Sequence, residues 1–306
     1  MTWTHYRLLF RLESPLHIGY RKTGNLMQTR RYVPGKNLWA ALTERLVHLA
    51  GQAPNAQAYR RVGAVLKQSF RFGYLWPTYE GRTSGWAPHF PWSDPAHWDY
   101  LYLDSRVGTA QMPTSRTADE GSLHEVEFIA PYTREGRPVY LVGDLWVRDD
   151  ALQNIMSVNW QTALQRLQIG GERTYGWGRL RLVEPANWEA NGRGPGDLPH
   201  WGNGWHWDEK DGEVVIESRE NAGEGGENHI RLPVHALAAD ANGSKAVVNL
   251  QGPVEPVLGW ERQSAAGYRL SQAMIMYEPG TRVVSALRQA YLAPWGYLQG
   301  PQENDA

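Results

Sequence analysis

The 306-residue sequence contains no cysteine. Disulfide bonds and cysteine-ligated zinc are therefore excluded, which fits a reducing compartment. No apolar run approaches the roughly 18 residues that a membrane helix needs, and residues 1–10 lack the pattern of a signal peptide. We therefore expect a cytoplasmic protein without a membrane partner.

The sequence also lacks an excess of either charge, with 31 basic and 32 acidic residues and a net charge of −1. A general nucleic-acid binder would show a strong basic excess, so any such site must be local. The charges are unevenly placed: Tyr20–Lys36 carries five cations and no acid, whereas Asp208–Glu227 is mostly acidic. Fifteen tryptophans and fifteen tyrosines suit either core packing or stacking on bases.

The first half of the chain alternates between strand and helix patterns. Hydrophobic periodicity predicts, in order, strand His5–Glu13, helices Lys36–Ala50 and Asn55–Gln68, strands Leu123–Ile129 and Val139–Val147, helix Ala151–Gln168 and strand Arg179–Val183. Tyr20–Lys36 is expected as a basic loop, and the aromatic Phe70–Tyr100 as an irregular insertion. This order of β, α, two β, α and β is that of a ferredoxin-like, RNA-recognition-type α+β fold.

Composition divides the chain into three parts. We expect a ferredoxin-like domain over residues 1–183 with an insertion at about 70–122, and a Gly- and Trp-rich connector over 184–229. Short strands punctuated by glycine and proline predict a smaller β-rich module over 230–306, of degenerate ferredoxin-like or related type.

The most informative segment is Ile169–Leu182, which places four glycines among three arginines and two aromatic residues. Glycines let successive backbone N–H groups turn toward an anion, arginines add forked donors, and aromatic rings offer faces for bases. A phosphate-binding P-loop is excluded because Gly-Lys-Ser/Thr is absent, and the loop follows a predicted helix rather than a strand, unlike a dinucleotide fold. From the residues alone, a backbone-binding loop and a structural turn are about equally supported.

Three stretches together resemble the RAMP superfamily of CRISPR RNA-binding proteins. They are Ser14–Gly19 leading into Tyr32–Leu42, the Gly-rich Gly170–Arg179, and Arg106–Ala110 running to Arg116–Leu123, which resembles the tip of an extended hairpin. Gly259-Trp260 and Glu278–Thr281 look like the closing segment of the subunit that caps the 5′ end of the guide RNA in type III effector complexes, the fifth Cas subunit class. Thr281 departs from the commoner serine, and the segment Phe70–Trp98 matches no part of that family.

The resemblance implies a non-catalytic subunit that holds the 5′ tag of the guide RNA and caps the backbone of a multi-subunit antiviral complex. Its implied partners are the guide RNA, the target nucleic acid paired to it, and neighbouring backbone and large subunits, with no cofactor. The RNA-binding residues expected from charge, glycine content and resemblance are His17, Arg21, Lys22, Arg30, Arg31, Lys36, Arg106, Arg116, Gly170, Gly171, Arg173, Tyr175, Gly176, Trp177, Gly178 and Arg179.

Two other classes of function remain open from the sequence. RAMP relatives include metal-independent ribonucleases, for which His17 would be the best acid–base candidate, and backbone subunits cut target RNA with a loop aspartate, for which Asp104 or Asp119 would serve. We expect no metal site, since His89, His97 and Asp94 are loosely spaced among prolines. A protein- or carbohydrate-binding module is the other alternative, suggested by the tryptophan count and the near-neutral charge.

Overall fold

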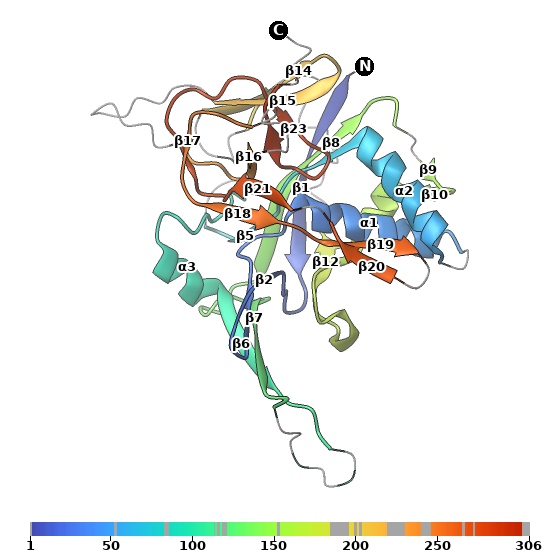
Figure 1. Ribbon diagram of the computed structural model, residues 1–306, viewed down its shortest axis with the longest axis vertical. Helices are drawn as coiled ribbons and strands as arrows, with labels where there is room; N and C mark the ends of the chain where they lie inside the picture. The colour runs from blue at the N-terminus through green and yellow to red at the C-terminus, as the bar shows by residue number, and fades with distance from the viewer. Residues whose placement is uncertain are drawn as a thin grey trace.

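The computed structural model describes residues 2–51, 54–82, 86–112, 114, 117, 121–151, 154–183, 196–198, 201, 204–218, 230–239, 246–264, 267–271 and 273–301. A six-stranded antiparallel sheet, the main sheet, forms the centre of the first half (Figure 1). Its strands run in the order β11-β12-β1-β8-β4, and β5 also pairs with β8. They are β1 (Trp3–Leu12), β4 (Phe70–Phe72), β5 (Trp76–Tyr79), β8 (Val139–Arg148), β11 (Arg166–Gln168) and β12 (Arg179–Leu182).

Helices cover one face of the main sheet. They are α1 (Gly35–Leu49), α2 (Ala56–Ser69) and α4 (Trp160–Leu164), while α3 (Pro95–Tyr102) lies at the root of a projecting arm. Leu38, Leu42 and Leu46 recur every four residues and are fully buried in α1, which confirms the predicted helix. The Asn55 side chain caps α2 by accepting from the Ala58 N–H. The succession β1-α1-β4-β8-α4-β12 confirms the ferredoxin-like fold.

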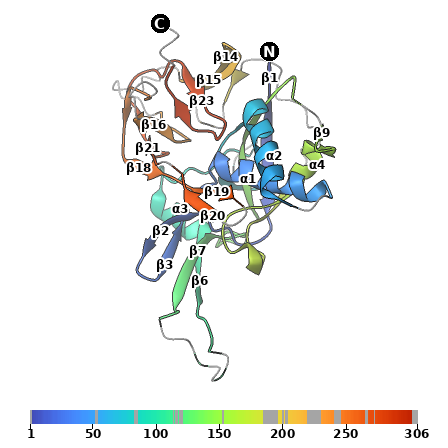
Figure 2. The same cartoon turned by 45° about the vertical axis from the view of Figure 1, so that its right-hand side comes forward.

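A second, four-stranded sheet builds the arm that projects from the body (Figures 1 and 2). We call it the arm sheet; its order is β2-β3-β7-β6, and its strands are β2 (Gly19–Thr23), β3 (Leu26–Thr29), β6 (Leu103–Gly108) and β7 (His124–Ile129). The basic segment predicted as a loop therefore begins with a β-hairpin, which turns at Gly24 with a φ of +58°. Because β3 pairs in parallel with β7, this hairpin is attached directly to the arm.

The second half of the chain forms an eight-stranded sheet in the order β13-β14-β15-β23-β24-β16-β21-β18. Its strands are β13 (Gly196–Asp197), β14 (Trp205–Lys210), β15 (Glu213–Ser218), β16 (Ala236–Ala239), β18 (Val254–Val257), β21 (Met274–Tyr277), β23 (Ala290–Leu292) and β24 (Leu298–Gln299). Two short pairs accompany it, β17 (Leu250–Gln251) with β22 (Arg282–Val283) and β19 (Trp260–Ser264) with β20 (Gly267–Leu270). Strands β13–β15 lie in the stretch expected as a connector, and the end of the acidic segment Asp208–Glu227, from residue 219 onward, is outside the described residues.

The tryptophans form a second core between the main sheet and the C-terminal sheet. Trp3, Trp76 and Trp146 come from the main sheet and pack in one cluster with Trp201, Trp205 and Trp207. Every tryptophan side chain that the structure describes is buried or partly buried. The described tryptophans therefore serve packing, six of them between the two sheets and others, such as Trp98 and Trp160, in the core of the first half, and they give no support to a carbohydrate-binding surface.

The predicted helix Ala151–Gln168 is wrong over most of its length. Among the described residues of this stretch, only Trp160–Leu164 is helical; it is preceded by the hairpin β9 (Asn154–Ile155) and β10 (Val158–Asn159) and followed by β11. Met156 and Ser157 adopt φ values of 52° and 66°, which close the hairpin and break the helical path. Residues 70–79, expected in an insertion, form β4 and β5 and complete the main sheet beside β8.

Candidate nucleic-acid interface

The Gly-rich loop joins β11 to β12, so a strand, not a helix, leads into it. Gly170, Gly176 and Gly178 have φ values of +86°, +83° and +76°, a region that favours glycine. A Cβ on Gly178 would lie 1.8 Å from the Ile169 carbonyl oxygen, and one on Gly170 would lie 2.3 Å from that of His17. The glycines are therefore required by the close approach of the loop to the end of β11 and to His17, which lies between β1 and β2.

His17 lies buried beneath this loop. Its Nδ1 is 2.7 Å from the carbonyl oxygen of Glu127, and its own carbonyl accepts the Gly171 N–H at 2.8 Å. Because the ring bonds to β7 and the carbonyl bonds to the loop, His17 holds the loop against the arm sheet. His17 therefore supports the loop from below through these two hydrogen bonds.

The top of the loop carries unsatisfied backbone donors. Glu172 is left-handed, with φ 54° and ψ 25°, and the short 3-10 turn Arg173–Tyr175 follows it. Among the described residues, the N–H groups of Glu172, Arg173 and Thr174 find no acceptor. Three consecutive free N–H groups next to a left-handed residue can cradle an anion such as a phosphate.

The side chains of the loop divide into exposed and buried ones. Tyr175 is 77% exposed, and Arg179 is exposed on the first residue of β12. Arg173 is also exposed, but its guanidinium pairs with Glu44 of α1. Trp177, expected to stack on a base, is only 6% exposed and packs edge-on against Phe128 of β7 at 4.9 Å. Tyr175 is therefore the ring that is free to stack.

The strand register brings two expected RNA-binding cations onto the face of the arm sheet that meets the loop. Lys22 pairs with Met27, Met27 with Val126, and Val126 with Arg106, so these four side chains form one row across the sheet. Val126 and Met27 also pack with Trp177 of the loop. Lys22 and Arg106 therefore stand at the two ends of a row on which the Gly-rich loop rests.

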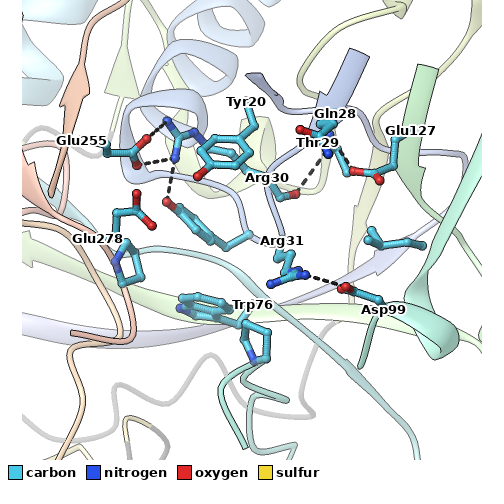
Figure 3. Close-up of a pocket in the computed structure, with 14 residues that line it drawn as sticks. Tyr20, Gln28, Thr29, Arg30, Arg31, Trp76, Asp99, Glu127, Glu255 and Glu278 are labelled. Atoms are coloured by element: carbon cyan, nitrogen blue, oxygen red, sulfur yellow. Dashed lines mark hydrogen bonds and ion pairs between the residues drawn. The ribbon is translucent and has the colours of Figure 1, made fainter. Parts of the chain in front are cut away.

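Three other expected cations lie away from that face. Arg21 stacks on Tyr20, with its guanidinium carbon 4.5 Å from the ring centre, and reaches to 3.8 Å from Glu278. Arg30 and Arg31 line a cavity, where they pair with Glu255 and Asp99 (Figure 3). These two arginines, expected at RNA phosphates, are engaged within the chain.

The last two expected cations are also separate from the row. Lys36 lies at the start of α1, with its Nζ 4.5 Å from the ring centre of Trp295 in the C-terminal half. Arg116 is outside the described residues, as is Asp119.

A buried polar network around Arg30 is the feature that the sequence did not predict. Arg30 donates to both carboxylate oxygens of Glu255, at 2.6 and 3.0 Å, and to the Tyr32 hydroxyl at 2.9 Å. Tyr74 donates to Nδ1 of His235 at 2.6 Å, and Nε2–H of His235 bonds to Glu255 at 2.7 Å. The partners are scattered along the chain, so no local sequence signal could have identified them.

The network sets the ionisation of its members. Burial opposes the charge of Glu255, but hydrogen bonds from His235 and Arg30 lower its pKa to about 2. Burial lowers the pKa of His235 despite the nearby carboxylate, and it raises the pKa of Tyr32 and Tyr74. The network therefore contains a charged Arg30–Glu255 pair held by neutral side chains.

A family comparison identifies the chain. The model of the RAMP superfamily matches residues 9–181, more than half of the sequence. The chain belongs to the RAMP superfamily. No curated protein matches it.

Solved structures resemble the chain at low identity and with TM-scores below 0.5. One is a chain of a type III-B Cmr-beta assembly bound to cognate target RNA and AMPPnP, with a TM-score of 0.46 and 12% identity over 90% of this chain and 85% of that one. Another is a chain of a type III-B Cmr-beta assembly bound to cognate target RNA, with a TM-score of 0.44 and 11% identity over 90% of this chain and 86% of that one. Cmr6 from Pyrococcus furiosus has a TM-score of 0.31 at 12% identity, covering 60% of this chain and all of that one. At these identities and TM-scores the likenesses transfer no role to this RAMP protein.

The other enzyme and metal candidates have structural contacts in this RAMP protein. Asp104 on β6 pairs with Arg134 at 3.1 Å, and Asp94 caps α3 by accepting the His97 N–H. His89 is buried beside the Tyr102 hydroxyl at 3.1 Å, and burial lowers its pKa to about 4. Within the described part of the chain, no three His, Asp or Glu side chains are grouped to hold a metal ion, and no helix is long and apolar enough to span a membrane.

Proposed function

We propose that this RAMP protein is a non-catalytic subunit of a multi-subunit CRISPR effector complex, in which it holds the 5′ tag of the guide RNA and caps the backbone of the complex. The observation that carries the proposal is the junction of the Gly-rich loop with the arm sheet. There the free N–H groups of the loop, exposed Tyr175 and Arg179, and the cations Lys22 and Arg106 belong to two elements that pack against each other.

Each part of this junction has a chemical role in the proposal. The N–H groups of Glu172–Thr174 and the Arg179 guanidinium bind phosphates of the tag, and Tyr175 stacks on a base. Lys22 and Arg106 bind further phosphates at the two edges of the arm sheet. Residues 1–183 form the RNA-binding domain, and the β-rich remainder supports it and meets neighbouring subunits.

The charge distribution agrees with a local site. A chain with a net charge of −1 gains little from nonspecific attraction to RNA, so affinity has to come from a few phosphate contacts placed by the fold. Each lost phosphate contact should reduce the slope of log K against log salt concentration by about the same amount.

The test is binding of the purified chain to a short guide RNA with an intact 5′ tag, compared with the same RNA with a scrambled tag, across a salt series. We expect tag-dependent binding without cleavage, and a slope of log K against log salt that falls by roughly 0.7 in Arg179→Gln. Arg148→Gln is the control. Arg148 lies on β8 opposite Trp3 in the strand register, at the end of β1 that is far from the loop.

Three results would contradict the proposal. Equal affinity for tagged and scrambled RNA would remove the tag-holding role. An unchanged salt slope in both Arg179→Gln and the double variant Lys22→Gln/Arg106→Gln would remove the junction as the site. Cleavage that disappears in His17→Ala would identify a processing ribonuclease instead.

A further inference from the structure

The Tyr175 ring, the exposed aromatic group of the Gly-rich loop, has no contact of its own that fixes its position. It is 77% exposed, and its side chain has no hydrogen-bond or ring partner among the described residues. Trp177, two residues further on, is instead seated against Phe128, with 4.9 Å between the ring centres. The position of the Tyr175 ring is therefore set by the backbone of the turn that carries it.

One side chain holds this turn at both ends. Gln168, the last residue of β11, donates from Nε2 to the Arg173 carbonyl oxygen at 2.8 Å and to the Trp177 carbonyl oxygen at 3.0 Å. Tyr175 lies midway between Arg173 and Trp177 in the sequence. Figure 1 shows the turn projecting beyond β12, beside the arm. The Gln168 amide therefore closes the base of the projection that carries the exposed ring.

The two partners fix the orientation of the Gln168 amide. Both are carbonyl oxygens, which only accept hydrogen bonds, and a side-chain amide carries two N–H donors on its nitrogen. A flipped amide would set its own oxygen against both carbonyl oxygens. Each N–H of the amide therefore has one acceptor, and a side chain without donors at this position cannot make the pair of bonds.

Without Gln168, the turn has little to hold it. Its backbone bonds are those of one short 3-10 turn, at 2.9 and 3.0 Å, with a third that is long at 3.4 Å. Hydrogen bonds in a 3-10 turn have poor geometry. The Arg173–Glu44 ion pair is partly exposed to solvent and contributes little. The two bonds from Gln168 are therefore the main restraint on the turn.

Gln168 is itself anchored in the main sheet. It lies opposite Arg179 in the register of β11 with β12, and the next residue, Ile169, donates its N–H to the Gly178 carbonyl at 2.9 Å. Leu167 and Ile169, on either side of Gln168, are buried in the core. The Gln168 side chain therefore ties the turn to a well-packed part of the fold.

We propose that Gln168 is a positioning residue of the loop: it holds the turn Arg173–Trp177 so that the Tyr175 ring stands ready to stack on an RNA base. The inference rests on the proposed function for the identity of the ligand. A ring that is already held in place loses less conformational freedom on binding, so preorganisation raises affinity without an added contact. Gln168 acts through Tyr175 and does not itself touch the RNA.

The first part of the test uses the free full chain and no RNA. By NMR, the Nε2 protons of Gln168 should exchange with solvent more slowly than those of Gln165, which is exposed and has no side-chain hydrogen bond to the described residues. Gln168→Met keeps the length of the side chain and removes both donors. We expect the order parameter of the Tyr175 N–H to fall from about 0.85 to below about 0.6 in Gln168→Met, and to stay unchanged in the control Gln165→Met.

The second part is a double-mutant cycle of Gln168→Met with Tyr175→Ala, measured as affinity for the tagged guide RNA. In the chain that keeps Tyr175, Gln168→Met should weaken binding by roughly fivefold, the lower end of what one base–aromatic stack contributes. In the Tyr175→Ala chain the same substitution should weaken binding by less than about twofold, because no ring is left to position. Gln165→Met should leave the affinity unchanged in both chains.

The outcomes separate this inference from the proposed function. Unchanged order parameters in Gln168→Met would overturn the inference, and so would equal losses of affinity in the two chains, which indicate a merely structural role. Exchange of the Gln168 Nε2 protons as fast as that of Gln165 would overturn it without any variant. Equal affinity of the wild type for tagged and scrambled RNA would contradict the proposed function alone, since the cycle can then be run with either RNA. Spectra otherwise identical to that of the wild type show that the variants are folded.

Discussion

Arg30 and Glu255 are 225 positions apart in the sequence, yet they form a two-pronged ion pair with N···O distances of 2.6 and 3.0 Å. Arg30 follows the β2–β3 hairpin, and Glu255 lies on β18 at the edge of the C-terminal sheet. Both side chains are largely buried. The pair therefore ties the root of the arm to the second half of the chain.

Breaking this pair on one side should destabilise the fold. Arg30→Gln leaves Glu255 buried without its cation, and we expect a loss of about 3–5 kcal/mol in the free energy of unfolding. Chemical denaturation measures it. Arg134→Gln, which breaks the exposed pair with Asp104, should cost less than about 1 kcal/mol. Similar losses in the two variants would show that the Arg30–Glu255 pair does not hold the halves together.

The same network predicts a pH dependence of stability. Folding lowers the pKa of His235 below its usual 6.5 and that of Glu255 from about 4.5 to about 2, so the unfolded chain takes up protons first. Both contributions are complete at neutral pH and are lost on acidification, that of His235 below about 6.5 and that of Glu255 between about 4.5 and 2.

Chemical denaturation at pH 7, 5 and 3 tests whether the free energy of unfolding falls on acidification. Between pH 5 and 3 the wild type should lose about 2 kcal/mol more stability than Glu255→Gln, which has no carboxyl group to protonate at this position. Parallel curves for the two proteins would mean that Glu255 titrates normally in the folded state.

The ferredoxin-like half could be predicted because its elements carry local patterns. The leucine spacing of α1 and the alternation in β1, β7 and β8 each specify one element without reference to the rest of the chain. The helix predicted over Ala151–Gln168 failed because its apolar residues also suit a hairpin, and the left-handed Met156 and Ser157 give no glycine signal.

The candidate site was predictable in part, for a similar reason. The glycines mark the loop because close backbone contacts exclude any side chain, but the burial of Trp177 depends on β7, which is about fifty residues away in sequence. The engagement of Arg30 depends on β18 and cannot be predicted from a run of basic residues. Local composition therefore located the loop, while the pairing of distant strands decided which cations stay exposed.

Substitution of Gly178 tests the loop geometry, with Gly24 as the matched glycine. Gly178→Ala would place a Cβ 1.8 Å from the Ile169 carbonyl oxygen, whereas a Cβ on Gly24 would meet nothing within 4 Å, although φ is positive at both positions. We expect Gly24→Ala to cost about 1–2 kcal/mol for its conformation alone. Gly178→Ala should cost clearly more in urea denaturation and should abolish tag binding. Equal costs would show that the loop can move away from β11 freely.

The two aromatic residues of the loop should separate stability from RNA binding. Trp177→Ala removes a buried ring from its contact with Phe128, and we expect a loss of about 3–5 kcal/mol in the free energy of unfolding. Tyr175→Ala changes an exposed ring and should alter stability by less than about 0.5 kcal/mol. In tagged-RNA binding, Tyr175→Ala should lose about 1–3 kcal/mol, the usual value of one base–aromatic stack.

Trp177→Phe provides the control for this pair, because it keeps an apolar ring against β7 and should recover most of the stability. If Trp177→Phe is stable yet binds tagged RNA as weakly as Tyr175→Ala, then Trp177 itself contacts the RNA after a rearrangement of the loop. If instead Trp177→Phe binds like the wild type and only Tyr175→Ala is weakened, the exposed ring of Tyr175 is the stacking surface and Trp177 is the residue that seats the loop on the arm sheet.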